Sequence, residues 1–133
     1  MLRATRREME KSHRIHRTSS NAGSSASQKL LLVYAVECGL KALLMHEHRV
    51  DTYSDLPEAA KINHDLREAL KQLRAPASMR VRTVTTRHQR NPQETVHPNE
   101  LHQTFRYGIP IADETDVIAD LNSVAEWIKE RLG

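Results

Sequence analysis

Four polar side chains lie at helical spacing in or just after the most apolar stretch of this 133-residue sequence, residues 28–47. At 100° per residue, one stripe of a helix would hold Tyr34, Glu37, Lys41 and His48. Glu37 and Lys41 stand four residues apart, the spacing that places opposite charges side by side on a helix. Because a lone buried charge is too costly, these groups need partners from other elements. A carboxylate, an ammonium, a phenol and an imidazole on one stripe could bind a ligand or move a proton.

Metal and nucleophile chemistry are poorly matched by the spacing of the other reactive residues. A di-iron bundle needs two Glu-x-x-His pairs and two further glutamates on facing helices. The spacing occurs at Glu10 and His13. Its second instance, Glu94 and His97, falls in a segment without helical periodicity. The sequence also contains no Gly-rich phosphate loop and no strand–turn–helix nucleophile elbow. We therefore expect no metal site and no bound cofactor.

Apolar periodicity predicts an all-α, up-and-down bundle of four or five helices that would position the polar stripe. The predicted helices cover residues 2–18, 28–47, 58–74, 98–107 and 115–132. Ser27 is expected to cap the second helix, and the third is expected to break near Asn63. With 4% aromatic residues, four Gly and five Pro, the composition argues against a β-sandwich or barrel with frequent turns. A chain of this length indicates a single domain, residues 1–133.

Positive charge is concentrated in two segments, although the formal net charge is only +3. Residues 1–17 hold six Arg or Lys against two Glu, and residues 76–97 hold four Arg against one Glu. This pattern is typical either of a protein that binds a phosphate-bearing partner or of a solvated charged surface. Neither segment contains an aromatic side chain that could stack on single-stranded bases. Residues 76–97 are predicted to form a basic loop, short exposed hairpin or extended arm before the fourth helix.

The sequence favours a cytoplasmic protein that makes no contact with a membrane. In a secretion signal, an apolar core follows the basic N-terminus, and here no such core follows the basic N-terminal stretch. The apolar run is too short and too charged to span a bilayer. Cys38 is the only cysteine, which excludes an internal disulfide and suits a reducing compartment.

Three short strings resemble the HEPN superfamily of helical proteins. They are VYAVECGLKALL at residues 33–44, NHDLREAL at 63–70 and FRYG at 105–108. The first is similar to the second helix of a branch that reads roughly GYAVECALKAL. In that branch an HDL helix start and a late RY follow in the same order. The resemblance extends over about residues 28–131.

This resemblance implies a compact helical domain, usually a homodimer, in bacterial toxin–antitoxin, nucleotidyltransferase-partnered or antiviral defence systems. Many HEPN proteins are metal-independent ribonucleases with an Arg-x(4–6)-His motif. In such a motif the arginine holds the scissile phosphate and the histidine moves a proton. The match in this chain is Arg90 with His97, where the polar Asn91 follows the arginine. Other Arg and His residues in the chain have similar spacing, among them Arg6 and His13.

The HEPN-like strings also contain a second set of polar residues, which together with Tyr34 could form one network. The set comprises Glu37, Lys41, His64, Asp65, Arg106 and Tyr107. It could bind a nucleotide phosphate or RNA, or it could be a buried network that fixes helix register and dimer geometry. Two functions therefore stay open: a ribonuclease of a defence or toxin–antitoxin system, and a non-catalytic subunit. The subunit would dimerise and dock on a larger effector, a nucleotidyltransferase or an antitoxin.

Overall fold

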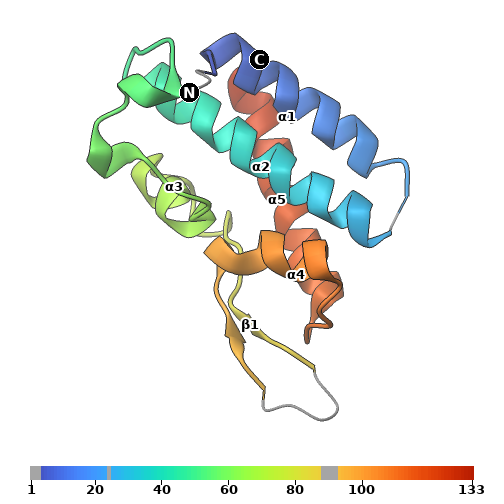
Figure 1. Ribbon diagram of the computed structural model, residues 1–133. Coiled ribbons are helices and arrows are strands. Elements are labelled where there is room, and N and C mark those ends of the chain that lie inside the picture. The colour runs from blue at the N-terminus through green and yellow to red at the C-terminus, as the bar shows by residue number, and fades with distance from the viewer. Residues whose placement is uncertain (1–3, 24, 88–92) are drawn as a thin grey trace.

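The computed structural model describes residues 4–23, 25–87 and 93–133, and these residues form a mostly helical protein (Figure 1). The helices are α1 (Arg6–Ser20), α2 (Ala26–Glu47), α3 (Leu66–Gln72), α4 (Leu101–Tyr107) and α5 (Glu114–Leu132). Short 3-10 helices cover Tyr53–Asp55, Glu58–Ala60 and Pro98–Glu100. The strands in the described ranges are β1 (Val84–Thr85) and β2 (Thr95–Val96), which pair antiparallel. The prediction of a mostly helical protein is confirmed.

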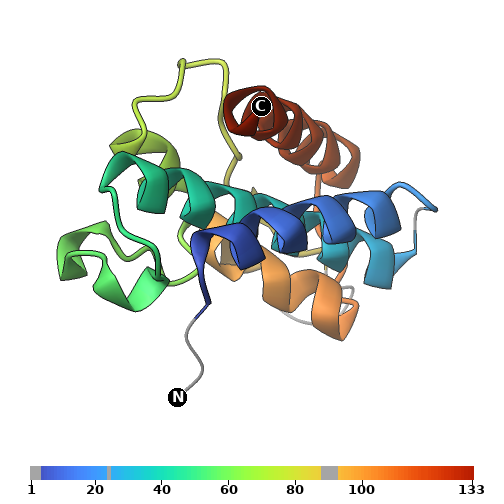
Figure 2. The same cartoon turned by 90° about the horizontal axis from the view of Figure 1, so that it is seen from above.

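Helix α2 is the centre of the molecule, with α1, α3, α4 and α5 packed around it (Figures 1 and 2). Half of its 22 residues are buried. Each fully buried Leu or Val side chain contributes roughly 1.5–3 kcal/mol through the hydrophobic effect. In the part of the chain that the structure describes, no helix, α2 included, has the length and apolar character needed to cross a membrane.

Helix α2 starts two residues earlier than predicted, because Ser25 caps it and Ser27 does not. The Ser25 hydroxyl accepts the Gln28 N–H at 3.3 Å, and the Gln28 side-chain oxygen accepts the Ser25 N–H at 3.0 Å. This reciprocal pair is a capping box, which satisfies two backbone donors at once. Ser27 has no Glu or Gln three residues further on, so it offers only half of this arrangement.

His13 joins α1 to α2 in the buried interface between them. The two helices lie side by side and run in opposite directions (Figure 1). The His13 ring is 3% exposed, and its Nδ1–H donates to the Ala35 carbonyl at 2.7 Å. Burial lowers the pKa of His13 below its ordinary value of 6.5, and the bond to Ala35 opposes that shift without cancelling it. The folded protein therefore disfavours protonation of this ring.

We expect the free energy of unfolding to fall as the pH decreases from about 6.5, in part because of His13. In the unfolded chain His13 has the ordinary pKa of 6.5, so below that pH the unfolded chain binds a proton that His13 binds less readily in the folded protein. Protonation therefore favours unfolding. Above 6.5 this contribution to stability is fully present. Urea unfolding of the native protein and of His13→Gln at pH 7.5 and 5.5 measures it. An equal pH dependence in the two proteins would show that His13 makes no contribution.

The third predicted helix is broken at the expected place, and the break forms a tight turn. The 3-10 helix Glu58–Ala60 ends well before α3 begins at Leu66. Between them, Asn63 and His64 have left-handed backbone conformations with φ of 42° and 71°. The Asp65 carboxylate then accepts the Glu68 N–H at 3.1 Å and caps α3. His64 consequently projects from a turn that its two neighbours define.

The segment before α4 forms a hairpin whose base is packed into the core. Val84 pairs with Val96, and both side chains are buried. Arg82 fastens the segment to α5 through Asp120, with guanidinium nitrogens 2.8 and 3.1 Å from the carboxylate oxygens. Partial burial raises the pKa of Asp120, but the hydrogen bonds from Arg82 outweigh it, and the net shift is downward. The predicted hairpin therefore forms, but its base is not exposed, because the paired Val84 and Val96 face the core.

Candidate functional site

A polar cluster lies where α2, the turn before α3 and α4 meet. It consists of Glu37, His64 and His102, and one ligand-capable atom from each residue lies within 4.8 Å of the others. Glu37 and His102 are 4% and 8% exposed, whereas the His64 side chain is 47% exposed. The cluster thus consists of two buried side chains and one histidine that solvent can reach.

Glu37 fixes the orientation of the His64 ring. His64 Nδ1 lies 2.9 Å from both carboxylate oxygens of Glu37. In a neutral ring, the Nδ1–H donates to the carboxylate and the lone pair is on Nε2. A carboxylate that holds a histidine in this tautomer is the arrangement that prepares an imidazole to accept a proton. The pair is therefore suited to general acid–base chemistry.

The backbone of His64 is strained. A non-glycine residue with φ of 71° costs roughly 1–3 kcal/mol and persists where the surroundings over-determine it. The capped start of α3 follows directly at Asp65, and Leu66 is fully buried. These anchors hold the turn in place, and the Glu37 bond defines where the ring lies. Such strain clusters at functional sites.

His102 closes the cluster from α4. Its ring stacks on His64 with centroids 4.2 Å apart and an angle of 22° between the planes. Its Nδ1 is buried and makes no hydrogen bond of good geometry among the described residues. Burial lowers the pKa of His102, and the neighbouring His64 lowers it further, whereas Glu37 and the Asn99 carbonyl act in the opposite direction. The His102 ring therefore favours the neutral form.

Arg106 lies one turn beyond His102 on α4 and donates a hydrogen bond to the Tyr34 hydroxyl. Tyr34 is itself one turn before Glu37 on α2, so α2 and α4 present two neighbouring polar contacts. The bond to Tyr34 raises the pKa of Arg106, and Tyr107 adds to the shift. Arg106 is exposed and keeps its charge, so a guanidinium stands beside the cluster.

The other members of the predicted network make separate contacts. The Lys41 ammonium lies 5.0 Å from the centroid of the Tyr53 ring, and in the described ranges Glu37 pairs with His64 and not with Lys41. Asp65 acts as the N-cap of α3. Tyr107 is 68% exposed at the end of α4.

The predicted catalytic pair Arg90 and His97 is only half described. Arg90 and the following Asn91 lie outside the described residues. His97 is exposed and directly precedes the 3-10 helix Pro98–Glu100. It is not part of the cluster around Glu37, and the assignment of a catalytic role to Arg90 and His97 stays a prediction.

Sequence reasoning did not identify His102. The signal that could have found it is the four-residue spacing between His102 and Arg106, which places both on one face of a helix. The inward-facing Leu101 and Phe105 suggest which side of the helix is buried, and His102 lies next to it. No local pattern links His102 to Glu37, however, because 64 intervening residues separate them.

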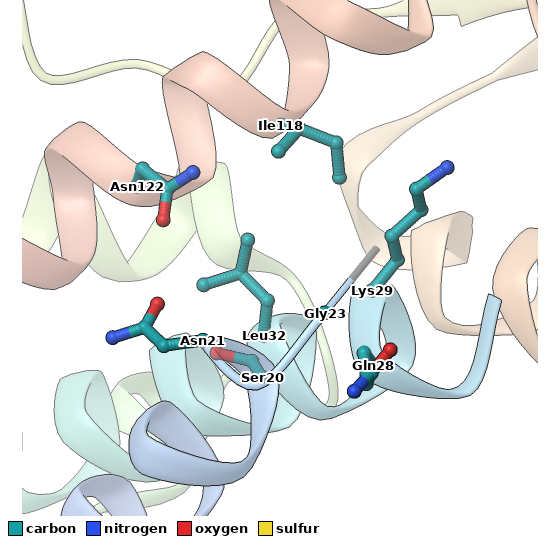
Figure 3. Close-up of a pocket in the computed structure, with 8 residues that line it drawn as sticks. All are labelled: Ser20, Asn21, Gly23, Gln28, Lys29, Leu32, Ile118 and Asn122. Carbon is teal, nitrogen blue, oxygen red and sulfur yellow. The ribbon is translucent and has the colours of Figure 1, made fainter. Parts of the chain in front are cut away.

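Figure 3 shows a pocket at the N-terminal end of α2, where α1 ends and α5 passes. Lys29 and Asn122 line it, but both are already engaged by other side chains. Lys29 pairs with Glu114 at 2.9 Å, and the Asn122 side-chain oxygen accepts from Arg17 at 2.7 Å. These polar groups fasten helices together, so we place the candidate site at the Glu37 cluster.

No protein-family model, curated protein or solved structure matches this chain. The site must therefore be interpreted from its own geometry.

Proposed function

We infer that this chain is a HEPN-like ribonuclease that acts as a cytoplasmic homodimer, without a metal ion, in a bacterial defence or toxin–antitoxin system. The observation that carries this inference is the Glu37–His64 pair, in which a buried carboxylate holds a half-exposed imidazole at 2.9 Å. The helical architecture is compatible with the HEPN resemblance. The cluster also joins two of the HEPN-like strings, those with Glu37 and His64, and Arg106 of the third lies beside it.

The chemistry follows from the roles that these groups can fill. His64 accepts the proton of an RNA 2′-hydroxyl, and the freed oxygen attacks the adjacent phosphorus. Glu37 stabilises the imidazolium that forms, and Arg106 stabilises the negative charge that builds on the phosphate oxygens. The 5′-oxygen leaves and takes a proton from water. The products are a 2′,3′-cyclic phosphate and a 5′-hydroxyl end.

The test is to incubate the purified protein with total RNA in the presence of EDTA and to analyse the RNA ends. We expect cleavage with cyclic phosphate ends by the native protein. Loss of cleavage in His97→Ala but not in His64→Gln would instead assign the reaction to Arg90 and His97. Absence of cleavage by a native protein that sediments as a dimer would contradict the ribonuclease proposal.

The second candidate function is a non-catalytic HEPN-like subunit that docks on a larger effector, a nucleotidyltransferase or an antitoxin. Tyr107 and Ile15 favour it, because large apolar side chains 68% and 52% exposed are available for a protein partner. This function predicts a stable dimer without RNA cleavage. Tyr107→Ala would weaken its association with the partner and leave the dimer intact.

A further inference from the structure

We propose that Glu37, His64 and His102 bind a divalent ion of the zinc class, and that the bound ion blocks His64. Their ligand-capable atoms lie within 4.8 Å of one another, although the three residues come from α2, the turn before α3 and α4. Two of the three are buried, so the cluster is an organised feature of the fold and not a chance meeting of surface side chains.

His102 supplies an independent indication of a ligand. The residue is more than nine-tenths buried, and its Nδ1 makes no hydrogen bond of good geometry in the described part of the chain, although the Asn99 carbonyl lies near the ring. Nearly all buried polar atoms in folded proteins have a partner, and a missing one is costly. An imidazole nitrogen with a free lone pair can instead bind a metal ion. A ligand at the cluster would therefore account for a polar ring at this buried position.

The donor set selects the class of ion. Two imidazoles and one carboxylate suit Zn²⁺ and Co²⁺, whereas Mg²⁺ and Ca²⁺ prefer oxygen ligands throughout. Three protein ligands leave a fourth position for water, and the exposed edge of His64 provides access to it. Zinc–nitrogen distances of about 2.0–2.1 Å require ligand atoms about 3.4 Å apart. The stacked rings of His64 and His102 must therefore turn away from parallel and close on the ion.

Binding changes the tautomer of His64. Its Nδ1 faces Glu37, and coordination through this nitrogen replaces the hydrogen bond to the carboxylate. Exchange with water moves the ring proton from Nδ1 to Nε2, so the proton count of a neutral ring is unchanged. Nε2 then has no lone pair to accept a proton. This inhibition of cleavage rests on the proposed function, whereas the binding of the ion does not.

Isothermal titration of the EDTA-treated, dialysed full-length protein with ZnCl₂ tests the binding. We expect one ion per chain, and affinity at least about tenfold weaker in His102→Ala and in His64→Ala. His46→Ala is the matched control, since His46 is an exposed histidine of α2 outside the cluster. Titration with MgCl₂ is expected to give no binding. Circular dichroism verifies that each variant is folded. If His102→Ala unfolds the core, His64→Ala still tests the site, because it removes only a half-exposed ring.

Two outcomes would overturn the site: no zinc binding by the native protein, or binding that the two cluster variants leave unchanged. RNA cleavage gives the separate test of inhibition. Zinc is expected to stop cleavage with the midpoint found by titration, and EDTA to restore it. Zinc binding by a protein that never cleaves RNA would contradict the proposed function and support the metal site. Cleavage without zinc binding would contradict only the metal site.

Discussion

Replacing His64 with glutamine is expected to lower the rate of RNA cleavage by about 100- to 10,000-fold, the range that a general base contributes. The glutamine amide can still donate to Glu37, so the buried carboxylate keeps a hydrogen-bond partner. It cannot accept the 2′-hydroxyl proton, because its nitrogen has no available lone pair. The loss should therefore appear in catalysis and not in folding. Single-turnover cleavage of a labelled RNA measures the rate.

The control for this substitution is His46→Gln, which makes the same change at an exposed position of α2 away from Glu37. Its cleavage rate should equal that of the native protein. Thermal unfolding of both variants reports whether the fold is intact. A His64→Gln protein that is folded and cleaves at the native rate would remove His64 from the mechanism.

Secondary structure was predictable where apolar residues recur at one spacing over many turns. Helix α5 satisfies this condition, α2 was predictable instead as one long apolar run, and the expected break near Asn63 also occurs. Helix ends were less predictable. The true cap of α2 depends on a side-chain exchange between Ser25 and Gln28, and the adjacent Ser27 looks equally suitable as a single residue.

The partner of Glu37 could not be deduced from local spacing. Within a helix, the i,i+4 rule favoured Lys41 as the neighbour of Glu37. In the folded protein, Lys41 turns toward the Tyr53 ring, and His64 meets the carboxylate from another element. An i,i+4 ion pair within a helix typically contributes only about 0.3–0.5 kcal/mol, so tertiary contacts readily replace it.

His64 shows why the candidate site needed the structure. The HEPN resemblance placed His64 in a polar network, but it did not indicate in which direction the ring points. The left-handed turn at Asn63 and His64 directs the ring toward α2. Asn and His are enriched in this conformation, but the two residue types alone do not specify that both adopt it here. His102 then meets it from a helix that begins well over thirty residues later.

Gly39→Ala is expected to lower the free energy of unfolding by about 1–2 kcal/mol, against the usual preference of a helix for alanine. A Cβ at position 39 would lie 2.6 Å from Ile128 Cγ2 and 2.8 Å from His13 Nδ1. Neither neighbour yields easily, since Ile128 is β-branched and fully buried, and His13 is bonded to the Ala35 carbonyl. Overpacking of this kind typically costs about 1–3 kcal/mol, and the gain in helix propensity of up to about 1 kcal/mol offsets only part of it.

Urea unfolding of a double-mutant cycle separates the two effects. Ile128→Ala removes Cγ2 and leaves a cavity, so it destabilises on its own. In the double variant the added methyl group at position 39 enters that space, and the combined loss should be smaller than the sum of the two single losses. Strict additivity would mean that Gly39 and Ile128 do not press on each other. A Gly39→Ala protein more stable than the native one would show that helix propensity outweighs the close approach of α1, α2 and α5.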